Sequence, residues 1–411
     1  MTLLTKSHPS TVLGHPKEQR IRNLFALTSE ISLYIYIFAS AFLQLIANLP
    51  NFAPAILALA TLFAVISNPN RLVKLPVLIA WLIVFSMFLI DFTIHKLDTT
   101  TLKYFFFWAI LFTDFILLHG NPAFWSRARA ILISFLLFHF FFLAPHPSNP
   151  SRLALRYDLG LYMANSNRLA YWCGFGALST LCIFFQSSEL KKKLLSVLIA
   201  IICIFVMLST ESRGALLSFL IAVFCYLILG FRRDLKTIFS IGLLICLFGV
   251  AGYIFQTQLS TKIKQIEYRI KVEKYQEYRM SARVPALKSA IATILRYPFS
   301  GTGKNSVHLN PKYHEYYRHK SPHNGFVVIA LHYGLIPTIF YAILWIMISA
   351  KIVDFLKLRK KYGEHAEHVE ILALIVFIFL NSNMSNFQGL VSFFSILYIT
   401  KILSIEFKLR E

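Results

Sequence analysis

The sequence predicts an all-α polytopic membrane protein, with about 12 transmembrane helices and one large, helical loop at about 257–323. Of the 411 residues, 57% are hydrophobic and only 15% are charged, which is unusual for a soluble chain of this length. Apolar runs near the length of a bilayer-spanning helix recur along the chain. Backbone polar groups in lipid must be paired within their own segment, so these runs predict helices.

The predicted spans follow from the positions of these runs in chain order. They lie at about 27–48, 52–67, 74–94, 104–119, 129–144, 169–186, 193–209, 214–230, 237–256, 324–350, 369–383 and 388–404. The tenth run contains Gly334 and Pro337. This pair fits either one kinked helix or a short interfacial helix followed by a span.

The orientation follows from the basic residues in the short loops. Clusters at 71–74, 127–129, 191–193, 232–236 and 357–361 all fall on the side of the basic N-terminal segment, which the positive-inside rule places in the cytoplasm. An even number of spans returns the C-terminus to the same side. The loops at about 145–168 and 257–323 are then external.

Three parts are expected. Residues 1–256 hold the first nine spans and the small external loop, 257–323 form the large loop, and 324–411 hold the last three spans. The large loop carries thirteen Lys and Arg against four Glu. Long loops cross the membrane largely regardless of charge, so its basic character calls for a functional reason.

Composition also bears on the class of partner. The chain has 41 Lys and Arg against 19 Asp and Glu, for a net charge of +22. Most of the basic residues flank apolar runs, which favours contact with anionic lipid headgroups and argues against nucleic acid. The five cysteines all lie inside apolar runs and read as small core residues. No Asp-x-Asp motif is present, so we expect neither a bound metal nor a cofactor.

Two arginines are candidates for binding an anion. Arg283 lies just before a helix that Pro285 is suited to start, where free N–H groups and the helix dipole favour an anion. The alternative is an exposed loop arginine. Arg213 lies in an external turn, Ser209-Thr-Glu-Ser-Arg-Gly214, where it could extend to lipid phosphate or point into a polar cavity.

The pair His323-Asn324 opens the tenth apolar run. A histidine at this position could be a satisfied interfacial residue, an aromatic-belt residue or a general base, because imidazole titrates near neutral pH. Asn324 could orient the imidazole or bind a sugar hydroxyl. Asp114 and His139 also lie inside apolar runs, and Asp114 is expected to be a buried hydrogen-bonding residue.

Together these segments resemble the O-antigen ligase and O-antigen polymerase superfamily. The resemblance runs from about 150 to 350. It is carried by Arg156…Gly160…Asn165-Ser-Asn167-Arg-Leu-Ala170, Ser212-Arg-Gly-Ala215, Arg283-x-x-x-Leu287, Tyr297-Pro-Phe-Ser-Gly-Thr-Gly303 and His323-Asn-x9-Gly334-Leu-Ile336.

The resemblance implies a metal-independent glycan transferase at the periplasmic face of the bacterial inner membrane. It implies that Arg213 and Arg283 hold the pyrophosphate of an undecaprenyl-linked glycan donor, and that His323 takes the proton of the acceptor hydroxyl. Asn324 is expected to bind substrate too, as are the residues Arg156, Asn167 and Arg296.

The expected acceptor is lipid A–core, as in the O-antigen ligase, since a basic loop suits a phosphorylated acceptor. An O-antigen polymerase, or a protein O-oligosaccharyltransferase of the same superfamily, is the alternative. A transporter of lipid-linked glycans is a third hypothesis. Transporters place ionisable residues near the midplane, whereas the charges here are predicted to gather at one external face.

Overall fold

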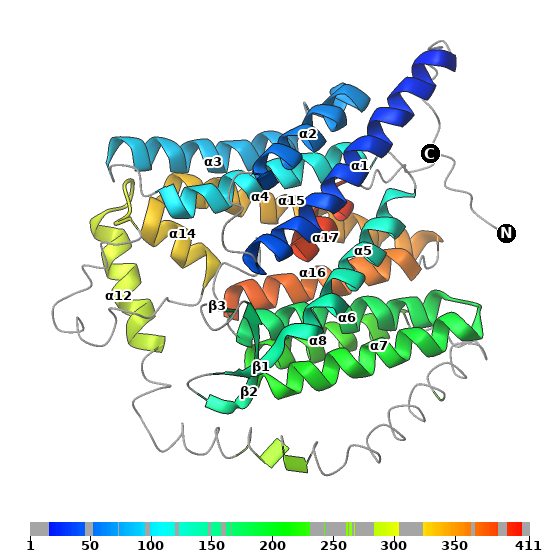
Figure 1. The fold of residues 1–411 in the computed structure, drawn as a ribbon. Helices are drawn as coiled ribbons and strands as arrows, with labels where there is room; N and C mark the ends of the chain where they lie inside the picture. Colours follow the sequence, from blue (N-terminus) through cyan, green and yellow to red (C-terminus); the bar gives the residue numbers. More distant parts are fainter. Residues whose placement is uncertain are drawn as a thin grey trace.

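The computed structural model describes residues 16–45, 52–72, 74–94, 99–119, 123–146, 149–157, 162–164, 166–230, 283–303, 324–362, 366–384 and 393–404, together with isolated positions between 242 and 267. The fold is predominantly helical (Figure 1). The helices are α1 (Pro16–Leu45), α2 (Phe52–Ser67), α3 (Leu75–Thr93), α4 (Thr99–Leu118), α5 (Phe124–His139), α6 (Ser166–Gln186), α7 (Leu190–Ser209), α8 (Arg213–Gly230), α12 (Arg283–Arg296), α14 (Gly325–Tyr333), α15 (Leu335–Tyr362), α16 (Ala366–Met384) and α17 (Phe393–Ser404). Short 3-10 helices follow α2 (η1, Pro69–Arg71) and α5 (η2, Phe140–Phe142).

The helices confirm the all-α membrane fold. Among the described residues, five segments are long and apolar enough to cross a bilayer: Leu75–Thr93, Phe124–Phe142, Leu169–Gln186, Leu190–Ser209 and Leu335–Lys357. Shorter apolar helices cover Ile56–Ser67, Phe106–Leu118, Arg213–Leu229, Val369–Asn381 and Ser395–Ser404. The predicted ninth span, 237–256, lies outside the described residues except for Gly242.

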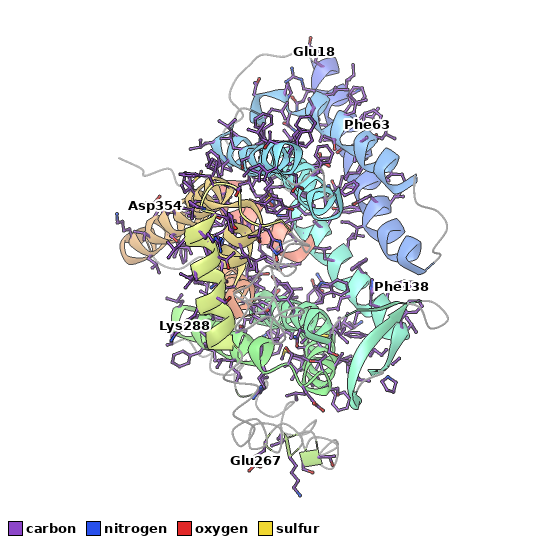
Figure 2. The ribbon with its side chains drawn as sticks, turned by 90° about the vertical axis from the view of Figure 1, so that its left-hand side faces the viewer. Glu18, Phe63, Phe138, Glu267, Lys288 and Asp354 are labelled. Carbon is purple, nitrogen blue, oxygen red and sulfur yellow. The ribbon has the colours of Figure 1, made fainter. Side chains whose placement is uncertain are left out.

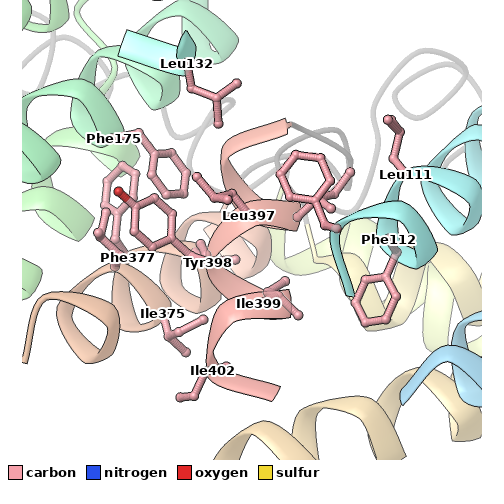
Figure 3. Packing of buried hydrophobic residues seen from close by; sticks show 14 of the residues in the cluster. Leu111, Phe112, Leu132, Phe175, Ile375, Phe377, Leu397, Tyr398, Ile399 and Ile402 are labelled. Atoms are coloured by element: carbon pink, nitrogen blue, oxygen red, sulfur yellow. The ribbon is translucent and has the colours of Figure 1, made fainter. Parts of the chain in front are cut away.

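The core lies where α17 packs between α4, α6 and α16. Figure 3 shows Tyr398 of α17 beside Phe175 of α6 and Phe377 of α16. The rings of Tyr398 and Phe175 are stacked with centroids 5.7 Å apart, and Tyr171 stacks on Phe377 at 5.3 Å. The last apolar segment of the chain is therefore central to the bundle.

Two ion pairs join helices at one end of the bundle. Arg129 of α5 donates to both carboxylate oxygens of Glu370 on α16 at 2.8 Å, and Gln186 of α6 donates to the same carboxylate at 2.8 Å. Arg127 of α5 pairs with the buried Glu30 of α1. Burial of a charge is tolerated only with such partners, so these contacts hold α1, α5, α6 and α16 in register.

A small antiparallel sheet lies at the opposite end, between α5 and α6. Its strands are β1 (Leu143–His146), β2 (Asn149–Tyr157) and β3 (Tyr162–Ala164), in the order β1-β2-β3. Leu143 of β1 pairs with Leu155 of β2, and Leu153 packs against the core. The sequence predicted only an external loop here. The strands β1 and β3 are too short to leave a periodic signal, and the alternation of Leu153, Leu155 and Tyr157 in the nine-residue β2 was not recognised.

Candidate active site

The segment after α12 is a tight turn that binds the backbone of α14. The N–H of Thr302 donates to the carbonyl of Leu331 at 2.8 Å, and the N–H of Gly303 donates to that of His332 at 3.1 Å. The hydroxyl of Thr302 also donates to the Leu331 carbonyl, at 3.0 Å. The turn thereby donates hydrogen bonds to the carbonyls of Leu331 and His332 in the last turn of α14, which accept no hydrogen bond from within that helix.

A third backbone hydrogen bond completes this junction. The N–H of Leu335, the first residue of α15, donates to the carbonyl of Pro298 at 2.7 Å. Residues 298–303 and 331–335 are thus held together by three backbone hydrogen bonds. Two of the motifs that carry the family resemblance therefore form one unit, which we call the docked turn (residues 297–303 with 331–335).

Two glycines make the docked turn possible. Gly301 and Gly334 have φ values of 61° and 79°, a left-handed conformation that favours glycine. A Cβ at Gly334 would lie 2.5 Å from the carbonyl oxygen of Phe299, and one at Gly301 would lie 2.5 Å from that of His332. Each glycine allows a backbone approach that any side chain would block.

Asn324 begins the short helix that ends at the docked turn. Its backbone is extended, with φ −133° and ψ 124°, and its side-chain oxygen accepts from the N–H of Val327 at 3.1 Å. This is an N-cap, and Gly334 is the C-cap of the same nine-residue helix. The run 324–350 is therefore a short helix followed by a span, the second of the two predicted arrangements.

The cap also bears on the expected role of Asn324. Its side-chain oxygen is engaged by the helix, so a substrate would meet the amide group in an orientation that the cap fixes. His323, the predicted base, lies outside the described residues. It directly precedes the N-cap in sequence, and the placement of its side chain stays a prediction.

Arg213 is the first residue of α8, whereas the sequence placed it in the turn before a span, and its side chain is half-buried. The turn before it is held by Thr210, whose hydroxyl donates to the Met207 carbonyl at 2.7 Å and accepts from the Ser212 N–H at 3.3 Å. Glu211 in this turn is only 4% exposed and has a φ of 54°. A buried glutamate in a left-handed conformation two residues before Arg213 was not singled out from the sequence.

The other predicted site residues occupy the ends of ordered elements. Arg283 begins α12, and Arg296 ends it with an exposed side chain whose guanidinium lies 5.5 Å from the centroid of the Tyr297 ring. Arg156 lies in β2, opposite Met163 of β3. Asn167 lies in the first turn of α6, half-buried.

These residues fall into two groups at one side of the molecule. The first comprises α12, the docked turn and α14, and the second comprises β2 and the adjoining ends of α6 and α8. Helix α16 contacts α6, α8 and α14 and so connects the groups. Figure 1 shows α12, α14 and the sheet on the left-hand side, whereas α5, whose first turns carry Arg127 and Arg129, begins on the right.

Two further polar residues of the apolar runs, Asp114 and His139, each make a hydrogen-bonding contact inside the bundle. Asp114 is buried and accepts a hydrogen bond from the Thr61 hydroxyl at 3.1 Å, as predicted. His139 is buried, with its Nδ1 2.6 Å from the Phe135 carbonyl oxygen. Cys173, Cys182 and Cys203 are buried free thiols, Cys225 is half-buried, and Cys246 lies outside the described residues.

A protein-family model matches this part of the chain. Residues 197–342 match a family model described as O-Antigen ligase. The match supports the O-antigen ligase superfamily. No curated protein matches the chain. The O-antigen ligase match includes Arg213, Arg283, Arg296, His323 and Asn324 and the whole docked turn, while Arg156 and Asn167 precede it.

Within the residues that the structure describes, no group of three or more His, Cys, Asp and Glu side chains could hold a metal ion. The ordered arrangement is instead one of helix starts and basic residues. Arg213 and Arg283 each begin a helix, and Asn324 caps a third. Helix N-termini present free N–H groups that favour an anion, so these helix starts are suited to an anionic group.

Proposed function

We propose that this protein is an O-antigen ligase that transfers a polysaccharide from undecaprenyl pyrophosphate to a sugar hydroxyl of lipid A–core. The observation that supports it most is the docked turn, which ties the helix beginning at Arg283 to the helix that follows His323. The family match over the same residues supports a glycan-transferring enzyme. The proposed site faces the periplasm, in an inner-membrane protein with both termini in the cytoplasm.

In the proposed mechanism, Arg213 and Arg283 bind the donor pyrophosphate. A guanidinium offers paired N–H donors that match phosphate oxygens, and its charge stabilises the pyrophosphate as it leaves. His323 takes the proton of the attacking hydroxyl. The bond between the sugar C1 and the phosphate oxygen breaks, a bond between C1 and the acceptor oxygen forms, and the pyrophosphate departs on its lipid carrier.

The neighbouring residues bind and orient the substrates. Asn324, Arg156, Asn167 and Arg296 are proposed to contact the sugars or phosphates of the donor and acceptor. The chemistry needs no metal in this scheme, because the two arginines carry the positive charge that would otherwise be supplied by an ion. Membrane lipids surround the protein, and no nucleic acid partner is proposed.

We expect His323→Ala and Arg283→Ala to abolish glycan transfer without lowering the amount of protein in the membrane. Matched controls are His319→Ala and Arg279→Ala, which remove the same residue types four positions earlier in the chain. Arg283→Lys should also be inactive if both phosphate contacts are needed, because a lysine cannot form the paired contact. Full transfer by either alanine variant would overturn the proposed roles.

Deletion of the gene distinguishes the ligase from the polymerase of the same superfamily. Loss of all polymer from lipid A–core, with polymer retained on the lipid carrier, is the result expected for a ligase. A single repeat unit on lipid A–core would instead identify a polymerase. The measurement is the lipopolysaccharide banding pattern on a gel, with the lipid-linked glycans extracted from the same cells.

A further inference from the structure

Helix α12 exposes an apolar stripe that nothing in the described structure covers. Leu287 is 36% exposed, Ile291 45% and Leu295 76%, and Phe299 in the following turn is 69% exposed. Residues spaced by four lie on one face of a helix. On another face, Ser289, Ala290 and Thr293 are buried, and the helix contacts α14. The helix therefore has one face on the protein and an apolar face turned away from it.

The direction of α12 differs from that of the apolar spans. Figure 1 shows it running across the direction of α3, α6 and α7, at their left-hand end. Figure 2, seen from that end, shows α12 lying across the face of the molecule with Lys288 at its edge. With 14 residues it is about 21 Å long, shorter than the ~30 Å hydrocarbon core. Its length and direction suit a helix that lies along a membrane surface.

The apolar stripe continues onto the surface of a predicted span. The hydrogen bond from the Leu335 N–H to the Pro298 carbonyl places Phe299 next to the start of α15. There Leu335, Ile336 and Ile339 are 37%, 43% and 56% exposed, at the beginning of a segment apolar enough to cross the bilayer. Lipid that covers this end of α15 would meet Phe299 and then the stripe.

Basic residues border the stripe. Lys288 and Arg296 each follow a stripe residue by one position and are exposed, and the guanidinium of Arg296 stacks over the exposed Tyr297 ring. An apolar face with a basic edge is the pattern of a helix that binds an anionic lipid surface. The aromatic and basic pair at its end is typical of the level of the headgroups.

We propose that α12 is an interfacial helix that seats Leu287, Ile291, Leu295 and Phe299 among the lipids of the outer leaflet. This contact of α12 with lipid would hold its first residue, Arg283, at the depth of the lipid phosphates. This second consequence rests on the proposed function, because it matters only if Arg283 binds a lipid-linked pyrophosphate. The seating of the helix itself depends only on its contacts and exposure.

Photo-crosslinking tests the seating without any need for turnover. Benzoylphenylalanine would replace Ile291 or Leu295 in the stripe and, as a matched control, the exposed Ala292 on the adjoining face. The full-length protein would be placed in vesicles of phosphatidylethanolamine and phosphatidylglycerol with a trace of alkyne-tagged phosphatidylethanolamine. We expect strong lipid adducts from positions 291 and 295 and several-fold weaker ones from 292.

Two results would overturn the proposal. Adducts between two copies of the protein at 291 and 295 would show that the stripe is a protein interface, and equal lipid labelling at all three positions would show that no face is preferred. No glycan donor is present in these vesicles, so the labelling reports bulk lipid. If His323→Ala loses glycan transfer while its lipid labelling stays normal, that result supports the catalytic role of His323 and leaves the seating of α12 to the labelling alone.

A charge introduced into the stripe gives a second measurement. Ile291→Glu should reduce labelling from a probe at 295 several-fold, because a carboxylate is disfavoured among lipid chains. Ala292→Glu, one position along, should leave that labelling unchanged. Equal effects of the two variants would contradict the assignment of the stripe to the membrane.

Discussion

At the scale of single residues, two positions determine how the proposed site is built. Gly334 permits a backbone approach to Phe299, and Asn324 fixes the start of α14 through its side-chain oxygen. Neither residue need touch a reacting atom for its loss to matter. Asn324 caps the start of α14 and Gly334 caps its end, and together they hold the docked turn in place.

We expect Gly334→Ala to destabilise the docked turn and to reduce glycan transfer strongly. At φ 79° and ψ −171°, a residue with a Cβ costs on the order of 1–3 kcal/mol, and the added atom would also meet the Phe299 carbonyl. Thermal unfolding in detergent and the transfer rate measure the two effects. Gly242→Ala is the control, because a Cβ there meets nothing within 4 Å, and an equal loss in both variants would contradict the interpretation.

Asn324 can be tested by separating its cap from its amide. Aspartate caps a helix as well as asparagine does, whereas loss of the cap costs typically about 1 kcal/mol. We expect Asn324→Asp to keep the stability but to lose much of the activity, because a carboxylate has no N–H to donate to the substrate, and Asn324→Ala to lose both in part. If the aspartate variant is stable and fully active, Asn324 contributes only the cap.

At the scale of helices, the buried ion pair between α5 and α16 anchors the end of the bundle away from the proposed site. Glu370 is fully buried and is shared by Arg129 and Gln186. A buried carboxylate that loses its partner keeps the cost of its burial. The pair therefore specifies which helices meet as well as how firmly they do.

We expect Arg129→Ala to destabilise the protein by about 3–5 kcal/mol, the range for breaking a buried pair. The double variant Arg129→Met with Glu370→Met should recover much of that loss, because it leaves no unpaired charge. Lys192→Ala is the control, since its pair with Glu189 is 62% exposed on both sides and should change stability little. The midpoint of thermal unfolding in detergent would be compared for all variants.

The helices could be predicted from the sequence, whereas the contacts between distant segments could not. Apolar runs are a local signal, so α3, α6 and α7 coincide with predicted spans. The choice between a kinked helix and a broken one at Gly334 depended on a hydrogen bond from Leu335 to Pro298, residues far apart in sequence. Such a bond leaves no periodic pattern.

The candidate site could be predicted from the sequence only in part. Glycines at 301 and 334 were noticed as parts of motifs, but their role in bringing two backbones together needs the three-dimensional structure. The buried Glu211 was missed, because nothing in its sequence context distinguishes it from an exposed turn residue. The small sheet was missed as well, because β3 has only three residues and the alternation in the nine-residue β2 was not recognised.

At the scale of the whole molecule, the two ends of the bundle differ. The first turns of α5, which carry the ion-paired Arg127 and Arg129, lie at one end, and α12 with the sheet lies at the other. The basic clusters of the short loops predict that the first of these ends faces the cytoplasm. The proposed function requires this orientation, because its substrates are external.

Reporter fusions test the orientation. We expect green fluorescent protein fused after Glu411 to fluoresce, since it folds in the cytoplasm, and alkaline phosphatase fused after Asn310 to be active, since it needs the periplasm. Exchange of the two reporters provides the control, because each should then be silent. Phosphatase activity at the C-terminus would contradict both the orientation and the proposed periplasmic site.

The length of α14 sets both the distance and the rotation between its two ends. Its nine residues make about two and a half turns and about 13 Å, so the chain enters and leaves it on opposite sides of the helix. One inserted residue would swing the His323 end by about 100° relative to the docked turn, although every contact within the helix could be remade. The count of residues between His323-Asn324 and Gly334 is thus a constraint of its own, separate from which residues fill it.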